Sequence, residues 1–240
     1  PMLARSADSR FPSLTDRFVT YAKINTQAAE GSETYPSSAC QLDLARLLVE
    51  ELLALGIADA AMDEHGYVTA TLPANDPAMT EVPAIAFISH MDTYPLVSGA
   101  NVQPTFHENY QGGDIALPKN GLVISFSENP YLTTCIGETI ITSDGTTLLG
   151  ADDKAGIAEI MEAITLIVEN PGFKHGPVKV AFTPDEEIGA GVKHFDVKGF
   201  GATVAYTMDG GQRGEIENET FCADRALVCF VGRDIHPGYA

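Results

Sequence analysis

The chain has 240 residues, of which 45% are hydrophobic, and it carries a formal net charge of -19. This length fits one large domain or a domain and a half. The acidic excess argues against nucleic acid and anionic membranes as partners, because both bind basic surfaces. No run of 18 apolar residues, the length needed to span a membrane, is present.

In chain order, the spacing of apolar residues first predicts helices at residues 12–24 and 40–55. Residues 65–74, "HGYVTATLPA", indicate a strand that follows a turn. Residues 84–88 form a continuous apolar run, which is typical of a central strand buried on both faces. The segment that follows this run reads "SHMDT".

The second half of the chain alternates between β-like and helical patterns. Residues 94–147 contain many turn residues and short β-like runs, which predict an irregular β-rich excursion. A helix is predicted at 155–169, strands at 177–189 and 202–211, and further strands across 214–233. This order predicts an α/β fold with a mostly parallel mixed sheet flanked by helices.

Imidazole and carboxylate side chains follow the predicted strands or open the predicted helix. In α/β sheets, ligands bind beyond the carboxyl ends of the strands, so these side chains are candidates for one site. Nitrogen and oxygen donors without thiolates suit zinc, manganese or cobalt. The candidates are His90, Asp92, Asp152, Asp153, Glu186, Glu187 and Asp209.

Two pairs among these candidates are closely spaced, and their spacing suggests that the two members of each pair have different roles. His90 and Asp92 are two positions apart, so on an extended strand they project to the same side. One can bind a metal while the other orients the imidazole or the metal-bound water. Glu186 and Glu187 are adjacent and point in different directions, which suits one metal ligand and one general base.

The adjacent acids Asp152 and Asp153, in "LLGADDKAGIAEI", repel each other unless cations neutralise them. A single carboxylate of this pair could bridge two metal ions about 3.5–4 Å apart. A phosphate loop does not fit, because it requires G-x-x-x-x-G-K-[ST]. A magnesium site of the phosphatase type stays open, although His90 makes it less apt. So does an acidic α/β domain whose charges only form a solvated surface.

Six segments carry a resemblance to a known family. They are "FISHMDT", "NYQGGDIAL", "TLLGADDKAGIAEIM", "VAFTPDEEIGAGVKHFD", "AYTMDGG" and "HPG". They occur in the order found in the peptidase T family of tripeptide aminopeptidases, within the di-zinc aminopeptidase and carboxypeptidase superfamily. The resemblance implies a zinc-exopeptidase-like catalytic domain over residues 1–220. It also implies that residues 221–240 begin an α+β lid and dimerisation domain.

The resemblance also implies a role for each metal ligand in a site that holds two zinc ions. His90 and Asp209 match ligands of one zinc ion, and Asp152 matches the carboxylate that bridges both ions. Glu187 matches a ligand of the second zinc ion.

Three further residues match catalytic positions of the family. Asp92 matches the acid that orients the His90 imidazole, and Glu186 matches the general base. His236 matches a histidine that reaches the active site from the second domain. The implied activity is release of the N-terminal residue of tripeptides through attack by a metal-bridged water.

The sequence departs from the family pattern at its end. Family members are longer, and their later residues supply a further histidine ligand, whereas no later histidine follows His236 here. The resemblance therefore implies an incomplete second zinc site and little activity for the 240-residue chain, with a homodimer formed through the lid domain in the full-length protein. A related di-zinc carboxypeptidase or deacylase, and a non-catalytic metal-binding α/β fragment, remain as alternatives.

The cysteines and the first residues bear on the compartment. Cys40, Cys135, Cys222 and Cys229 form no C-x-x-C pair, so a zinc-thiolate site is not expected. The first ten residues contain no apolar stretch, and we expect no signal peptide in them. Few thiols in a chain of this size then indicate the reducing cytoplasm.

Overall fold

The structure is a computed structural model that describes residues 3–219, 222, 224, 226 and 228–233. The chain forms two compact units, Pro1–Asp209 and Gly210–Ala240. The domain boundary predicted at residues 220 and 221 lies further along the chain and stays a prediction. The strands predicted across 214–233 are absent from the residues that are described in that stretch. His236 lies outside the described residues.

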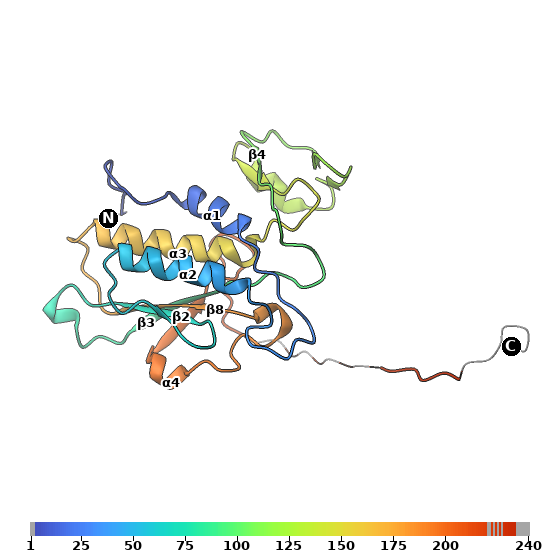
Figure 1. Cartoon of the computed structure of the whole chain (residues 1–240). Coiled ribbons are helices and arrows are strands. Elements are labelled where there is room, and N and C mark those ends of the chain that lie inside the picture. Colours follow the sequence, from blue (N-terminus) through green and yellow to red (C-terminus); the bar gives the residue numbers. More distant parts are fainter. Residues whose placement is uncertain (1–2, 220–221, 223, 225, 227, 234–240) are drawn as a thin grey trace, which may run out of the picture. The chain divides into compact units, whose positions relative to one another are not determined.

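A five-stranded sheet forms the centre of the first unit, in the order β1-β2-β8-β3-β9 (Figure 1). β8 and β9 run parallel to β3, whereas β1 and β2 are antiparallel to their neighbours. The predicted mixed sheet is therefore confirmed, and its three parallel strands lie together. The bounds are β1 (Ala61–Met62), β2 (Val68–Leu72), β3 (Ile85–His90), β8 (Val178–Thr183) and β9 (Val204–Thr207).

The parallel strands end near the same level. In the pairing register, His90 at the end of β3 lies opposite Thr183 at the end of β8, and Ile88 lies opposite Thr207 at the end of β9. The segments that follow these strands therefore leave the sheet from one edge, which is where parallel sheets bind ligands. β3 and β8 are rich in β-branched and aromatic residues, as expected for strands inside a sheet.

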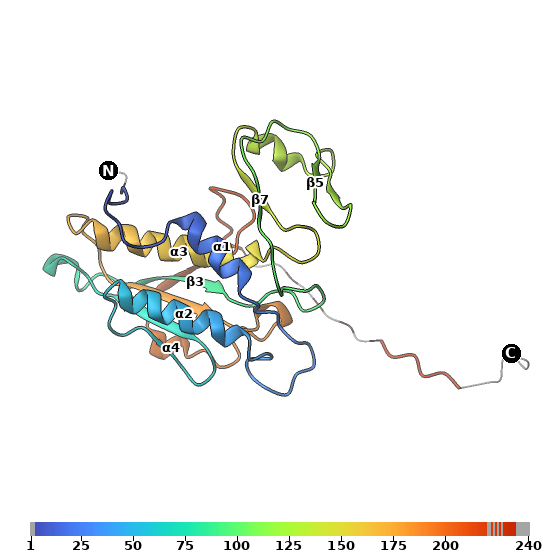
Figure 2. The same cartoon turned by 45° about the horizontal axis from the view of Figure 1, so that its top comes forward.

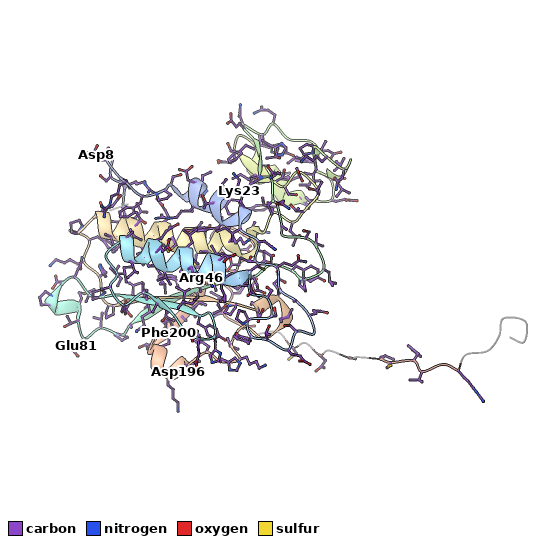
Figure 3. The ribbon with its side chains drawn as sticks, viewed as in Figure 1. Asp8, Lys23, Arg46, Glu81, Asp196 and Phe200 are labelled. Atoms are coloured by element: carbon purple, nitrogen blue, oxygen red, sulfur yellow. The ribbon has the colours of Figure 1, made fainter. Side chains whose placement is uncertain are left out.

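Three helices lie on one face of the sheet, and a short helix lies on the other face (Figure 1). The three are α1 (Leu14–Lys23), α2 (Gln41–Ala54) and α3 (Ala151–Glu169), close to the predicted ranges. The short helix α4 (Val197–Phe200) was not predicted, and Figure 3 labels Asp196 and Phe200 at its two ends. The Asp196 carboxylate accepts a hydrogen bond from the Gly199 amide at 2.9 Å. The predicted α/β class with flanking helices is confirmed.

The main core lies between the sheet and the long helices. The apolar stripes of α2 and α3 pack against side chains of β2 and β8, so burial of this face is what holds the layers together. The fully buried members include Leu44, Leu48 and Leu52 of α2, Ile157, Met161 and Ile164 of α3, and Val68, Val180 and Phe182 of the sheet.

One buried guanidinium links the three long helices. Arg17 of α1 donates to Glu51 of α2 and to Glu162 of α3, each at 3.0 Å. Tyr21 donates its hydroxyl hydrogen to Glu51 at 2.9 Å. Because every charged group in this network has an oppositely charged partner, the helices can pack closely around it.

The predicted β-rich excursion between β3 and α3 is also present (Figure 2). It contains two short antiparallel pairs and a 3₁₀-helix. The pairs are β4 (Thr105–His107) with β7 (Ile140–Thr142), and β5 (Ile115–Ala116) with β6 (Val123–Ile124). The 3₁₀-helix is η2 (Pro130–Cys135), and two others are η1 (Pro77–Met79) and η3 (Glu186–Ile188). Across the described residues, no helix is both long enough and apolar enough to cross a membrane.

Candidate metal centre

The site lies at the carboxyl edge of the parallel strands, where three distant segments meet. Hydrogen bonds between backbone groups continue past the strand ends: the Met91 amide donates to Thr183, and the Met208 amide donates to Ile88, both at 2.8 Å. These bonds fix the backbone on either side of His90 and immediately before Asp209. The positions of the two side chains therefore follow from the register of the sheet.

His90 is the central residue of the site, and its side chain is 3% exposed. Its Nδ1 lies 3.0 Å from the backbone carbonyl oxygen of Asp92 and 3.4 Å from the Asp92 carboxylate. Because a carbonyl oxygen can only accept a hydrogen bond, Nδ1 carries a proton. Nε2 is then the nitrogen that faces the other acids and can bind a metal, as in most histidine-metal sites.

Three ligand atoms converge beside His90 Nε2. The imidazole nitrogen, an Asp152 oxygen and an Asp209 oxygen all lie within 4.8 Å of one another. Nε2 is 2.8 Å from Asp152 Oδ1 and 3.8 Å from Asp209 Oδ1. Ligands that share one zinc ion at bond lengths of about 2.0–2.2 Å lie roughly 3.4 Å apart, so this donor set fits a zinc-like ion.

The acidic groups of the site raise the pKa values of His90 and Asp209. Burial raises the pKa of Asp209 to about 6, and the charges of Asp152 and Glu186 add to this rise. Burial lowers the pKa of His90, but its hydrogen bonds to Asp152 and Asp92 outweigh burial and raise this pKa to about 11. The cluster therefore retains positive charge at its centre, which is the place a divalent ion would take.

The two adjacent acids at the start of α3 have different surroundings. The Asp152 side chain is 72% exposed and reaches His90 Nε2, whereas Asp153 is buried and accepts a hydrogen bond from the His90 amide at 3.2 Å. The peptide bond between the two acids is cis, and both residues have non-helical backbone angles. Because the Asp152 carboxylate reaches His90 Nε2 and the Asp153 carboxylate contacts the His90 amide, only Asp152 joins the cluster.

Asp92 connects the end of β3 to the turn that carries the two glutamates. It is fully buried, and its two carboxylate oxygens accept hydrogen bonds from the amides of Glu186 and Glu187 at 2.9 and 3.0 Å. The contact with His90 that the sequence predicts is present, but the backbone carbonyl of Asp92 is closer to the ring than its carboxylate is.

The two glutamates of η3 differ in their distance from the cluster. The Glu186 carboxylate lies 3.9 Å from His90 Nε2 and is 54% exposed, at the rim of the site. Glu187 is not among the three residues whose ligand atoms converge. Its pKa is nevertheless raised by burial and by the charge of Asp152, so it shares the same acidic surroundings.

Sequence reasoning missed one residue that the site requires. A Cβ atom at Gly156 would lie 2.1 Å from the Met208 carbonyl oxygen, 2.4 Å from Asp153 Oδ1 and 2.6 Å from the Ser89 hydroxyl. Only glycine therefore allows α3 to approach β3 and the segment that leads to Asp209. A glycine inside a helical pattern was the available signal.

A family profile matches part of the chain. Residues 144–219, which include Asp152, Glu187 and Asp209, match the profile of Peptidase family M20/M25/M40.

Curated relatives match almost the whole chain. It is 54% identical over 228 residues to peptidase T from Geobacillus kaustophilus, which covers 95% of this chain and 55% of that protein. It is 56% identical over 229 residues to peptidase T from Desulfitobacterium hafniense, with the same coverage. The resemblance to the peptidase T family is confirmed, and the chain spans about half the length of these relatives.

Solved structures show the same fold. Aminopeptidase PepT from Bacillus cereus is 26% identical and superposes with a TM-score of 0.59, over 83% of this chain and 43% of that one. A tripeptidase from Staphylococcus aureus is 25% identical with a TM-score of 0.57, over the same shares of the two chains.

Proposed function

We propose that this chain carries the metal-binding part of a metal-dependent aminopeptidase that releases the N-terminal residue from tripeptides. The observation that carries the proposal is the convergence of His90, Asp152 and Asp209 at the carboxyl edge of the parallel strands. The similarity to peptidase T and to a solved tripeptidase supports the choice of substrate.

Zinc fits this donor set of one imidazole and several carboxylates. His90, Asp152, Asp209 and Glu187 are the residues that would hold it. When bound, zinc polarises the peptide carbonyl and lowers the pKa of a water molecule toward neutrality.

Glu186 would transfer the proton, and Asp92 positions the groups around it. Glu186 lies at the exposed rim, so its carboxylate can take a proton from the attacking water and pass it to the leaving amine. The Asp92 carboxylate accepts a hydrogen bond from the Glu186 amide, and the Asp92 carbonyl oxygen accepts one from His90 Nδ1. The base and the imidazole are therefore fixed by the same buried residue, which keeps the site preorganised.

The substrates and the oligomeric state that we propose follow from the same resemblance. The substrates are small peptides, and the full-length protein forms a homodimer through its lid domain. Cys40, Cys135, Cys222 and Cys229 are free thiols, which supports a reducing cytoplasm as the location.

The test is hydrolysis of tripeptides by the full-length protein loaded with zinc, compared with dipeptides and N-acyl amino acids. We expect tripeptides to lose their N-terminal residue. Glu186→Gln should lower kcat by about 10²-fold or more, because a general base contributes on that order. Release of the C-terminal residue, or cleavage of N-acyl amino acids in place of tripeptides, would favour the carboxypeptidase or deacylase instead. An unchanged kcat in Glu186→Gln would remove the proposed base.

A further inference from the structure

We propose that Asp185 is a positioning residue that holds the turn of Glu186 and Glu187 through a paired contact with Gln41. The inference rests on the proposed function, since it concerns how the proposed base and ligand are placed. Asp185 directly precedes η3, and the side chain that anchors it comes from Gln41 of α2.

Asp185 is buried and holds an uncommon backbone conformation. Its exposed fraction is 1%, and its φ is +58°, in the left-handed region that favours glycine and asparagine. Its carboxylate accepts hydrogen bonds from the Ser37 amide at 2.6 Å, from the Ser37 hydroxyl and from Gln41 Nε2 at 2.7 Å. Its own amide donates to Gln41 Oε1 at 3.1 Å.

Gln41 therefore contacts both the backbone and the side chain of Asp185. Gln41 is itself fully buried at the start of α2, where its amide group has little freedom to turn. The two ends of this amide group are complementary to Asp185: its oxygen faces a donor, and its nitrogen faces an acceptor. This pairing fixes where the backbone enters the turn.

The rest of the turn is closed by hydrogen bonds of its own. The amides of Glu186 and Glu187 donate to the Asp92 carboxylate. The Gly189 amide donates to the Glu186 carbonyl at 2.7 Å, and the Ala190 amide donates to the Asp185 carbonyl at 2.9 Å. The turn thus has two external anchors: Asp92 after β3, and Asp185 through α2.

Burying a carboxylate costs free energy, and a residue that only forms a turn does not require one. A buried charge loses its hydration, and the groups that contact Asp185 are neutral donors. Glycine would adopt the left-handed conformation at lower cost, and asparagine would adopt it without a charge. The requirement that Asp185 meets is for acceptors on both oxygens, which secure the turn against α2. A displacement of about 1 Å at a catalytic group can cost on the order of 10² in rate.

The pair can be tested by reversing its polarity in the full-length, zinc-loaded protein. Asp185→Asn tolerates the same φ but sets an NH₂ group against Gln41 Nε2, so two donors face each other. Gln41→Glu sets a carboxylate against the Asp185 carboxylate. In the double variant, the glutamate oxygens can accept from both the amide of residue 185 and its new side-chain NH₂ group, which restores the pairing.

We expect Asp185→Asn to lower kcat for a tripeptide about tenfold or more while KM stays within about twofold, and the double variant to recover most of the loss. Hydrogen exchange of the amides in residues 185–190 should rise in Asp185→Asn and return toward normal in the double variant. Asp76→Asn is the matched control. It removes a carboxylate that caps η1, outside the site, and should leave kcat unchanged.

The proposal would be overturned by a folded Asp185→Asn variant with normal kcat and normal exchange, or by a double variant no better than the single one. Should Asp185→Asn fail to fold, Ser37→Ala removes the hydroxyl that donates to Asp185 and accepts from the Ala29 amide, and it keeps the pair of Gln41 with Asp185. It should raise exchange in the turn and lower kcat by a smaller factor, and an unchanged turn would count against the proposal. If the unmodified protein hydrolyses no tripeptide, the proposed function fails, and hydrogen exchange alone still decides whether Asp185 holds the turn.

Discussion

At the scale of single residues, Asp152 and Asp153 show how neighbouring acids avoid each other. Asp152 faces solvent and His90, whereas Asp153 faces the interior and the backbone amide of His90. Burial raises the pKa of Asp153 to about 8. Adjacent acids in a sequence are expected to repel each other. In the structure, their side chains lie in two different environments.

The raised pKa of Asp153 leads to a pH dependence of stability in the zinc-free chain. Below about pH 4 this carboxyl group is protonated in both the folded and the unfolded chain. Between about pH 4 and pH 8 the folded chain keeps a proton that the unfolded chain releases, so the free energy of unfolding falls as pH rises. We expect Asp153→Asn to remove this contribution, so that the variant loses less stability than the unmodified chain as pH rises.

The measurement is the melting temperature of both proteins, with zinc removed, at about pH 5 and about pH 8. The unmodified chain should lose several degrees more than Asp153→Asn. Asp144→Asn is the matched control. Hydrogen bonds from Thr146 and the nearby Lys119 lower the pKa of the Asp144 carboxyl to about 2, so it does not titrate in this range. Equal pH slopes for Asp153→Asn and the unmodified chain would contradict the expectation.

Residue types and their places at strand ends were enough to predict the three converging residues. His90 and Asp209 follow apolar strands, and Asp152 opens an apolar helix, so a pattern in the sequence marks each of them. Asp185 and Gln41 had no such mark. Their pairing joins positions far apart in the chain, and an aspartate next to two glutamates resembles an ordinary acidic loop.

At the scale of elements, the packing of α3 against β3 depends on Gly156. A Cβ at this position would overlap the Met208 carbonyl and the Ser89 hydroxyl. We expect Gly156→Ala to push α3 outward and to destabilise the fold by about 1–3 kcal/mol, as overpacking does. Because Asp152 lies on α3 and Asp209 follows Met208, the same shift should weaken zinc binding.

Urea denaturation and zinc titration of the two proteins measure these effects. Gly172→Ala is the matched control, because a Cβ there meets no atom within 4 Å and the residue has no positive φ. This control should keep the stability and the zinc affinity of the unmodified chain. A Gly156→Ala variant as stable as Gly172→Ala would show that the close approach of α3 is not required.

The long elements were predictable because each has a clear apolar period. α1, α2 and β8 lie within the ranges predicted from the sequence, and β3 continues two residues past the predicted run at 84–88. α3 begins at Ala151, with regular helical geometry only after Asp153. The short elements had no such signal. β1 has two residues and α4 has four, so neither is long enough to show a period.

At the scale of the whole molecule, the order of the strands decides which residues meet. β3 lies between β8 and β9, so the segments after all three strands leave the sheet side by side. The alternation of elements predicted a mixed sheet, but not which strands are antiparallel. The direction of each strand depends on contacts between segments distant in the sequence, and local patterns do not report such contacts.

Net charge also acts at this scale. A chain with a formal charge of -19 repels itself, and its acidic cluster adds to the repulsion locally. A bound divalent ion reduces this repulsion and binds only the folded chain, so zinc should raise the stability of the whole molecule.

The most direct test of the account is zinc binding by the purified chain, measured by equilibrium dialysis. The unmodified chain should bind zinc and melt at a higher temperature when zinc is present. His90→Ala, Asp152→Ala and Asp209→Ala should each weaken binding by at least about tenfold. Asp196→Ala, which removes an acid outside the cluster, should bind as the unmodified chain does. Unchanged zinc affinity in all three site variants would contradict the account.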